Sequence, residues 1–158
     1  MTSSVRRAIT ADTEALATLL SNMQAHYKGP DPPGGATETA RLLTREGERI
    51  PFALMAEHEG KPAGFAILNP MLYSGSFQWL LHLKELYVVP EARSLGVGKV
   101  LMREIARVGL AGSYVRVEWT TDGTNTGAQR FYDRLGAARP EKVNYRLVGE
   151  SLKKIAGL

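Results

Sequence analysis

The sequence predicts a single α+β domain, built as a mixed but mostly antiparallel sheet of roughly six to seven strands flanked by about four helices. Three features predict this fold: an amphipathic helix pattern near the N-terminus, two turn-linked strand patterns after it, and alternating strand and helix patterns from residue 79 onward. Hairpin strands pair antiparallel and strand–helix–strand units pair parallel, so both kinds of pairing are expected. With 158 residues, the chain has the length of one domain, 1–158.

The N-terminal half is predicted to hold two helices followed by a β-hairpin. Apolar residues at helical spacing mark the first helix, namely Leu16, Leu19, Leu20 and Met23. The segment Lys28–Ala36 is rich in proline and glycine and predicts an exposed connection. A second, short helix is expected over Thr37–Glu46, and two strands are expected over Phe52–Glu57 and Pro62–Asn69.

The segment Trp79–Val89 is apolar on both of its alternating faces, which is typical of a strand buried inside a sheet. Three polar residues interrupt it, namely His82, Lys84 and Glu85. The two-residue period of a strand places His82 and Lys84 on the same face as Leu86, and Glu85 on the opposite face. Polar residues inside such a strand are candidates for chemistry, but a hydrogen-bonded histidine inside a sheet is an equally weighted alternative for His82.

Beyond this strand, helix and strand patterns alternate as far as the C-terminus. The inner face of the first of these helices carries Val97, Leu101, Ile105 and Val108. A strand is then expected over Val115–Trp119, a helix over Asn125–Leu135, and a last strand over Val143–Val148. A short C-terminal helix completes the prediction.

The composition excludes several classes of site and partner. The chain contains no cysteine, which rules out disulfides, thiolate metal ligands and a cysteine-bound acyl intermediate, and no metal site is predicted. The net charge is +4, but the lysines and arginines are scattered, so we expect no nucleic-acid partner. No apolar run has the length of a membrane span, and no apolar block of a secretory signal begins the chain. We therefore expect no membrane partner and a cytoplasmic location.

The hexapeptide Arg93–Gly98, R-S-L-G-V-G, lies between the buried strand and the next helix. Glycines let the backbone approach a ligand closely, and the first N–H groups of a helix are free to bind an anion such as a phosphate. Arg93, Lys99 and Arg103 add positive charge nearby. The hexapeptide is neither a P-loop nor a dinucleotide fingerprint, and taken alone it fits an ordinary strand-to-helix turn equally well.

The block LKELYVVPEARSLGVGKVLM resembles the acetyl-CoA-binding segment of the GNAT superfamily of N-acetyltransferases, in which a strand ending in L-x-V precedes [QR]-x-x-G-x-[GA]. Downstream, NTGAQRFYDRLGA is similar to the family's second signature, N-x-x-A-x-x-[FL]-Y-x-x-x-G. The pattern is most similar to that of the spermidine/spermine (diamine) N-acetyltransferase group. The resemblance implies a GNAT-like fold, acetyl-CoA (coenzyme A) as co-substrate and, since the family often dimerises through its late strands or C-terminal segment, a homodimer.

The resemblance also implies roles for individual residues. Backbone groups of the buried strand are expected to bind the pantetheine arm, at Leu86, Tyr87 and Val88. The pyrophosphate is expected on the following loop and first helical turn, at Arg93, Ser94, Leu95, Gly96, Val97, Gly98 and Lys99. Asn125 and Phe131 are expected to contact the pantetheine. Tyr132 matches the tyrosine that protonates the departing thiolate, typically a contribution of about 10²–10⁴-fold, although its place on an apolar helix face also fits a core tyrosine.

A base is needed because an alkyl ammonium, with a pKa of about 10.4, must lose a proton before its nitrogen attacks the thioester. His82 is the first candidate, since imidazole titrates near neutral pH, and Glu85 is the second, as base or as an anchor for a substrate cation. Lys84 departs from the pattern of the spermidine/spermine group, which has an acidic residue at this position. A lysine about 4 Å from a substrate ammonium would cost about 4 kcal/mol at an effective dielectric constant of about 20, which argues against a fully protonated polyamine. A substrate with its own carboxylate, such as an amino acid, suits Lys84. Trp79 is also expected to contact the substrate.

The predicted function is therefore transfer of an acetyl group from acetyl-CoA to a primary amine of a small molecule (amino acid, diamine or polyamine). Without a cysteine to carry the acetyl group, direct attack in a ternary complex is expected. Two alternatives remain, a non-catalytic acyl-CoA-binding or sensing domain and a protein lysine acetyltransferase. Tyr132, together with the polar residues inside the central strand, favours the enzyme.

Overall fold

The computed structural model describes residues 2–158, which divide after Thr120 into two compact units, each considered by itself. The first unit holds the sheet and the helices packed on it, and the second holds the last two helices. The expectation of one domain over 1–158 stays a prediction.

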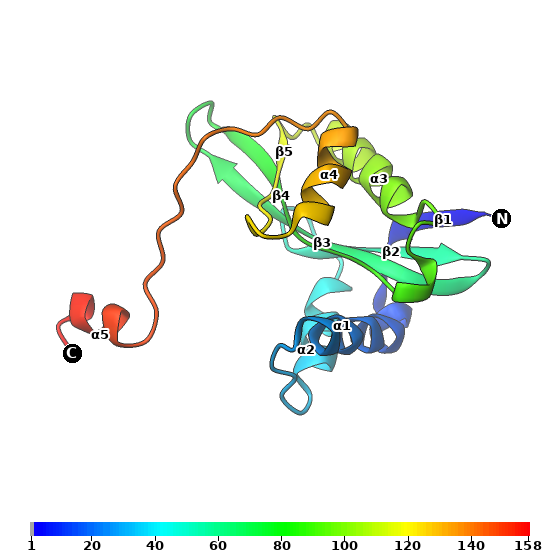
Figure 1. The fold of residues 1–158 in the computed structure, drawn as a ribbon, viewed down its shortest axis with the longest axis horizontal. Helices are drawn as coiled ribbons and strands as arrows, with labels where there is room; N and C mark the ends of the chain where they lie inside the picture. Colours follow the sequence, from blue (N-terminus) through cyan, green and yellow to red (C-terminus); the bar gives the residue numbers. More distant parts are fainter. Residues whose placement is uncertain (1) are drawn as a thin grey trace. The chain divides into compact units, whose positions relative to one another are not determined.

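The sheet lies entirely in the first unit (Figure 1). Its strands are β1 (Ser3–Arg7), β2 (Phe52–His58), β3 (Lys61–Tyr73), β4 (Gln78–Val88) and β5 (Val117–Glu118). They lie in the order β1-β2-β3-β4-β5, and all neighbours are antiparallel except β4 and β5, which are parallel. The predicted mixed, mostly antiparallel sheet is confirmed.

The prediction of roughly six to seven strands is wrong for the described residues, which form five. The segment Val143–Val148 has the alternation of a strand but pairs with no other strand among these residues, and Val143 and Tyr145 are 77% and 93% exposed. The strand expected over Val115–Trp119 shortens to the two residues of β5. By contrast, β1 was not predicted, because this edge strand is short and largely polar and shows no apolar alternation.

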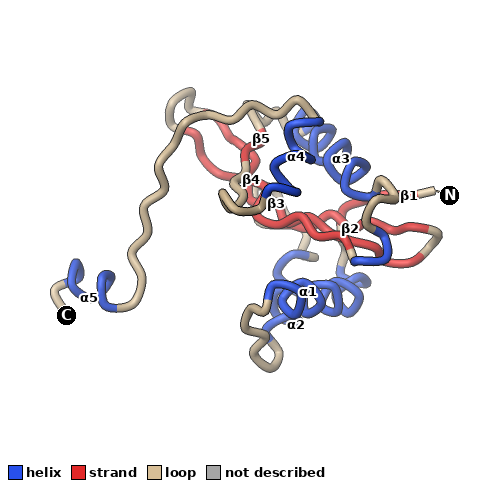
Figure 2. Tube along the Cα trace, in the orientation of Figure 1, coloured by secondary structure: helices blue, strands red, loops and turns tan. Residues whose placement is uncertain are grey.

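The described residues form five α-helices, where about four were expected. These are α1 (Thr13–Tyr27), α2 (Gly35–Leu43), α3 (Val97–Ala111), α4 (Thr126–Arg134) and α5 (Glu150–Ala156). In the first unit, α1 and α2 lie on one face of the sheet and α3 lies on the other, as Figures 1 and 2 show. Because helices cover both faces, the central strands are buried on both sides.

The core forms where these three layers meet. The largest fully buried side chains come from the central strands and from the inner faces of α1 and α3, and they include Leu16, Leu54, Met55, Phe65, Leu68, Leu81, Leu101 and Ile105. The apolar spacings that predicted α1 and α3 are therefore the spacings of their buried faces.

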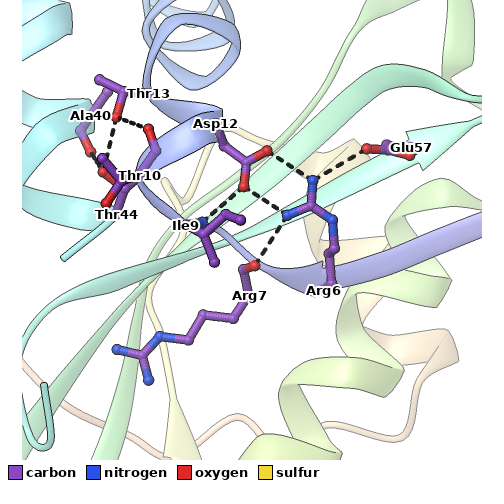
Figure 3. A network of polar contacts seen from close by, with 9 residues as sticks. All are labelled: Arg6, Arg7, Ile9, Thr10, Asp12, Thr13, Ala40, Thr44 and Glu57. Atoms are coloured by element: carbon purple, nitrogen blue, oxygen red, sulfur yellow. Dashed lines mark hydrogen bonds and ion pairs between the residues drawn. The ribbon is translucent and has the colours of Figure 1, made fainter. Parts of the chain in front are cut away.

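A polar network ties the helical layer of α1 and α2 to the sheet (Figure 3). The guanidinium of Arg6 in β1 donates to both carboxylate oxygens of Asp12, at 2.6 and 2.8 Å. This interaction also lowers the pKa of Asp12 below its usual value. The buried Thr44 hydroxyl donates to the Ala40 carbonyl oxygen at 2.9 Å and lies 3.1 Å from the Thr13 hydroxyl. These contacts tie the start of α1 to β1 and to the end of α2.

Candidate functional site

Strand β4 contains one more residue than the stretch of β3 opposite it. Leu68 of β3 pairs with Leu83, whereas the adjacent Ile67 pairs with Glu85. Lys84 is therefore the extra residue of a β-bulge, and Lys84 and Glu85 together oppose the single residue Ile67.

The bulge decides which side chains of β4 share a face. Asn69 and Ile67 are two residues apart in β3 and point to the same face, so their partners His82 and Glu85 also share that face. The predicted arrangement, with His82 on the face of Leu86 and Glu85 on the opposite face, is therefore wrong. Strict alternation fails because one inserted residue reverses the face of every residue beyond it.

A cavity of about 440 Å³ lies between α1, the α1–α2 connection and the sheet face that carries Glu85. Its apolar lining includes Leu20, Met23, Pro30, Pro32 and Ile67, and its polar lining includes Gln24, Asp31, Thr39, Lys84 and Glu85. The cavity lies wholly in the first unit and has the size of a small-molecule site.

Glu85 is half-buried beside this cavity, and burial raises the pKa of its carboxyl above the usual value. The positive charge of Lys84 lowers the same pKa by a smaller amount. Within residues 2–158, the side chains of Lys84 and Glu85 form no hydrogen bond and no ion pair. A carboxylate with a raised pKa is a stronger proton acceptor, and Glu85 is open to a ligand in the cavity.

The structure brings some of the predicted substrate and base residues together and leaves others apart. Lys84 and Glu85 line the cavity, whereas His82 and Trp79 are not among its described lining residues. His82 is half-buried where β4 pairs with β5. Trp79 lies towards the start of β4, where the guanidinium of Arg49 is 5.1 Å from the centre of its ring.

Asp31 lines the cavity although the sequence places it only in an exposed connection. It lies between Pro30 and Pro32. Proline fixes its own backbone φ and restricts the backbone of the residue before it. The two flanking prolines were therefore the one sequence feature that could have indicated a restricted backbone at Asp31.

The edge of β4 that faces β5 is paired only in part. Among the described strands, β5 pairs with β4 at Leu81 and His82 alone. Val89 donates its N–H to the Ala63 carbonyl oxygen, on the β3 side, at 3.0 Å. Since backbone groups alternate in direction along a strand, Val88 and Leu86 direct theirs away from β3.

The three residues expected to bind pantetheine are therefore not equivalent. Leu86 presents its backbone groups at the partly paired edge, and the Val88 carbonyl oxygen already accepts a hydrogen bond from Nε of Arg93 at 3.0 Å. The backbone of Tyr87 faces β3, and its buried ring lies 5.7 Å from that of Phe65, centre to centre. Tyr87 is thus part of the core at this point.

The loop after β4 ends at the N-terminus of α3. Gly96 is the N-cap residue of this helix with a φ of 84°, and Ser94 has a φ of 66°, so the chain turns sharply through two left-handed residues. The N–H groups of Val97, Gly98 and Lys99 have no carbonyl partner within the helix. Apart from Gly96 itself, its chain neighbours and the nearby backbone of the helix, no described atom lies within 4 Å of the position that a Cβ on Gly96 would take. Free N–H groups beside open space fit a bound pyrophosphate.

The second unit carries the other predicted residues. The side-chain oxygen of Asn125 accepts a hydrogen bond from the Ala128 N–H at 3.1 Å, so Asn125 caps α4. Phe131 and Tyr132 are half-buried on α4, with their ring centres 5.2 Å apart. Asn125 therefore has a structural role in α4, and the binding roles of these residues stay predictions.

Within residues 2–158, no three His, Asp or Glu side chains are placed to hold a metal ion together. No helix in this part of the chain is both long enough and apolar enough to cross a membrane.

Comparisons with known proteins agree with this geometry. The profile of the Acetyltransferase (GNAT) family matches residues 16–137. A D-amino-acid N-acetyltransferase of Saccharomyces cerevisiae, HPA3, is 31% identical over 140 residues, which are 87% of this chain and 86% of the relative. An uncharacterized N-acetyltransferase of Bacillus subtilis, YhfO, is 27% identical over 132 residues, covering 84% of this chain and 87% of the relative.

Solved structures show the same fold. An integron cassette protein from V. cholerae superimposes with a TM-score of 0.81 at 26% identity, covering 99% of this chain and 98% of the other. An aminoglycoside N-acetyltransferase, AAC(6')-Iy, in complex with CoA superimposes with a TM-score of 0.77 at 19% identity, covering 92% of this chain and 93% of the other.

The raised pKa of Glu85 predicts a pH-dependent cost in stability. At low pH the carboxyl is protonated in both the folded and the unfolded chain, so its burial does not lower the free energy of unfolding. As the pH rises through the folded-state pKa, the folded protein must ionise a poorly solvated carboxyl, and stability falls. Glu85→Gln should therefore raise Tm at about pH 7 but not at about pH 4, measured by calorimetry.

The matched control is Glu46→Gln, which changes an exposed glutamate in the connection after α2 and should leave Tm unchanged at both pH values. A lower Tm for Glu85→Gln at neutral pH would show that the Glu85 carboxylate is favourably placed and would contradict the raised pKa.

Proposed function

This chain belongs to the acetyltransferase (GNAT) family, and we propose that it transfers an acetyl group to the primary amine of a small molecule by direct attack in a ternary complex. The chain is an acetyl-CoA-dependent N-acetyltransferase. One observation carries the proposal for a small acceptor. One face of β4 lines a cavity and carries the half-buried carboxylate of Glu85 there. The edge of the same strand is incompletely paired and leads to the N-terminus of α3.

The residues at this edge and loop fit the co-substrate. Acetyl-CoA supplies the activated thioester when it is bound. Leu86 offers a backbone N–H and C=O to the amides of the pantetheine arm, while the first turn of α3 offers its N–H groups to the pyrophosphate. Arg93 and Lys99 are exposed there and add positive charge. Arg93 also holds the end of β4 through the Val88 carbonyl oxygen.

Glu85 is the base in this proposal, in place of His82, the first candidate from sequence. Glu85 lines the cavity, and its raised pKa brings it closer to the pH at which it works. It accepts one proton from the substrate ammonium, which frees the nitrogen lone pair. The nitrogen bonds to the acetyl carbon while the carbon–sulfur bond breaks.

Tyr132 gives a proton to the departing sulfur. The second proton that the nitrogen loses as the amide forms restores the Tyr132 hydroxyl, and the proton held by Glu85 is released to water, so that one proton is released in each turnover. The support for Tyr132 is its position seven residues after Asn125 in the second family signature. Asn125 and Phe131 are proposed to contact the pantetheine on the same grounds.

The acceptor is proposed to be an amino acid, a diamine or a polyamine. The spermidine/spermine subgroup has no specific support, and Lys84 places a positive charge in the cavity where a polyamine would bring another. The relative HPA3 is described as a D-amino-acid N-acetyltransferase. This supports an amino acid over a polyamine.

The cytoplasmic location and the homodimer also stay proposals. The exposed apolar side chains of the segment Val143–Val148 support the homodimer, since Val143 and Tyr145 remain largely uncovered within the described residues. A light-scattering mass of a single chain would contradict it.

Gly96→Asp should weaken acetyl-CoA binding by about 100-fold or more, because it places a carboxylate beside the N–H groups that hold the pyrophosphate. Isothermal titration calorimetry measures this directly. Gly157→Asp is the matched control, because Gly157 also has a left-handed φ, of 75°, and no described atom beyond the adjoining chain lies within 4 Å of the position of a Cβ there. Equal affinities in the two variants would place the phosphates elsewhere.

Tyr132→Phe should lower turnover by about 10- to 1,000-fold at unchanged acetyl-CoA affinity, since only leaving-group protonation is lost. Glu85→Gln should also lower turnover near neutral pH, but raising the pH should partly rescue it because more substrate arrives already deprotonated. His82→Ala should show neither effect. If His82→Ala shows the pH rescue and Glu85→Gln does not, His82 is the base and the proposal for Glu85 is wrong.

A further inference from the structure

The bulge in β4 places two opposite charges in one cavity. In a regular strand, consecutive side chains point to opposite faces. At the bulge, Lys84 and Glu85 both oppose Ile67, and all three line the same cavity. A cation and an anion that are adjacent in sequence therefore face the same small volume.

These two charges are available to a ligand. Within residues 2–158, neither side chain has a hydrogen bond or an ion pair, and the two interact with each other only at a distance. Glu85 is also half-buried, so it lacks part of the water that would otherwise solvate it. A ligand that carries both a carboxylate and an ammonium group, close together, satisfies both residues at once.

The rest of the wall is largely hydrocarbon. Leu20 and Met23 of α1, Ile67 of β3 and the prolines Pro30 and Pro32 line the cavity beside the charged pair. Burying an apolar ligand side chain against this wall is favourable. Burying a charged side chain there is unfavourable, because the wall offers few hydrogen-bonding partners.

We infer that the acceptor is an α-amino acid with an apolar side chain, whose carboxylate binds Lys84, whose ammonium group binds Glu85 and whose side chain packs against Leu20, Met23 and Ile67. This inference rests on the proposed function and names the substrate class of its site. The amino acid carries its ammonium and carboxylate groups on a single carbon, just as the bulge carries Lys84 and Glu85 on neighbouring residues.

A diamine is the competing occupant. It has two cations and no anion, so it would use Glu85 and Asp31, the other carboxylate of the cavity, and would leave Lys84 unpaired beside a like charge. Asp31 and Lys84 are both exposed and remain solvated without a ligand, whereas Glu85 is half-buried. The unfavourable contact of a diamine is therefore that of its second cation with Lys84. The diamine therefore satisfies the cavity less completely than the amino acid does.

The test compares leucine, as both enantiomers, with isoamylamine, which is leucine without its carboxylate, and with putrescine. For the unmodified protein, kcat/KM should be at least about 10-fold higher for one enantiomer of leucine than for isoamylamine or putrescine. Lys84→Met should bring the ratio of leucine to isoamylamine close to one, and Lys84→Glu should reverse it. Any effect of Lys84 on the protonation of Glu85 acts on both amines and cancels in the ratio.

Lys61→Met is the matched control, since Lys61 is an exposed lysine at the start of β3, outside the cavity lining, and its variant should keep the original ratio. A preference for putrescine, or a ratio unchanged in Lys84→Met, would overturn the inference while leaving amine acetylation intact. If acetyl-CoA binds by calorimetry and none of these amines nor a wider amine panel is acetylated, the proposed function itself fails.

Discussion

The bulge at Lys84 has to be held by the strands around it, because an inserted residue interrupts the backbone pairing and a slip of one residue would restore it. Strand β3 provides this hold. It is paired with β2 on one side and with β4 on the other, and its Phe65 and Leu68 are fully buried. Gly64 allows close approach, since a Cβ there would collide with the Tyr87 carbonyl oxygen. With the register fixed in this way, Glu85 faces the helical layer of α1 and α2 and not the layer of α3.

In the proposed function, the same strand serves two ligands by different means. Its face offers charged side chains at a mostly apolar cavity, and its edge offers backbone groups that continue into the free N–H groups of α3. The half-buried carboxylate of Glu85 has no hydrogen bond or ion pair in the described residues, and its burial is unfavourable for the folded chain alone. Unfavourable placements of this kind are concentrated at functional sites, because a ligand supplies the missing partner.

The sequence predicted the elements with buried faces and the loop before α3, because apolar periodicity and glycine placement are local properties. It identified Lys84 and Glu85 but assigned their faces by alternation, and no local pattern reveals a bulge whose cause is the pairing with β3. Asp31 was missed because its place in the cavity depends on how α1 and α2 pack on the sheet. The strand predicted over Val143–Val148 failed for the same reason, since a strand needs a partner that periodicity does not supply.

A single-turnover experiment with isotopically labelled acetyl-CoA distinguishes direct transfer between two ligands bound at one strand from transfer through an acetylated protein. The label is followed by mass spectrometry on the intact protein and on the small-molecule fraction as the acceptor amine is consumed. Direct attack predicts that the label passes into the amide of the acceptor and is at no time found on the protein. An acetylated protein that forms first and then loses its label to the amine would contradict direct transfer.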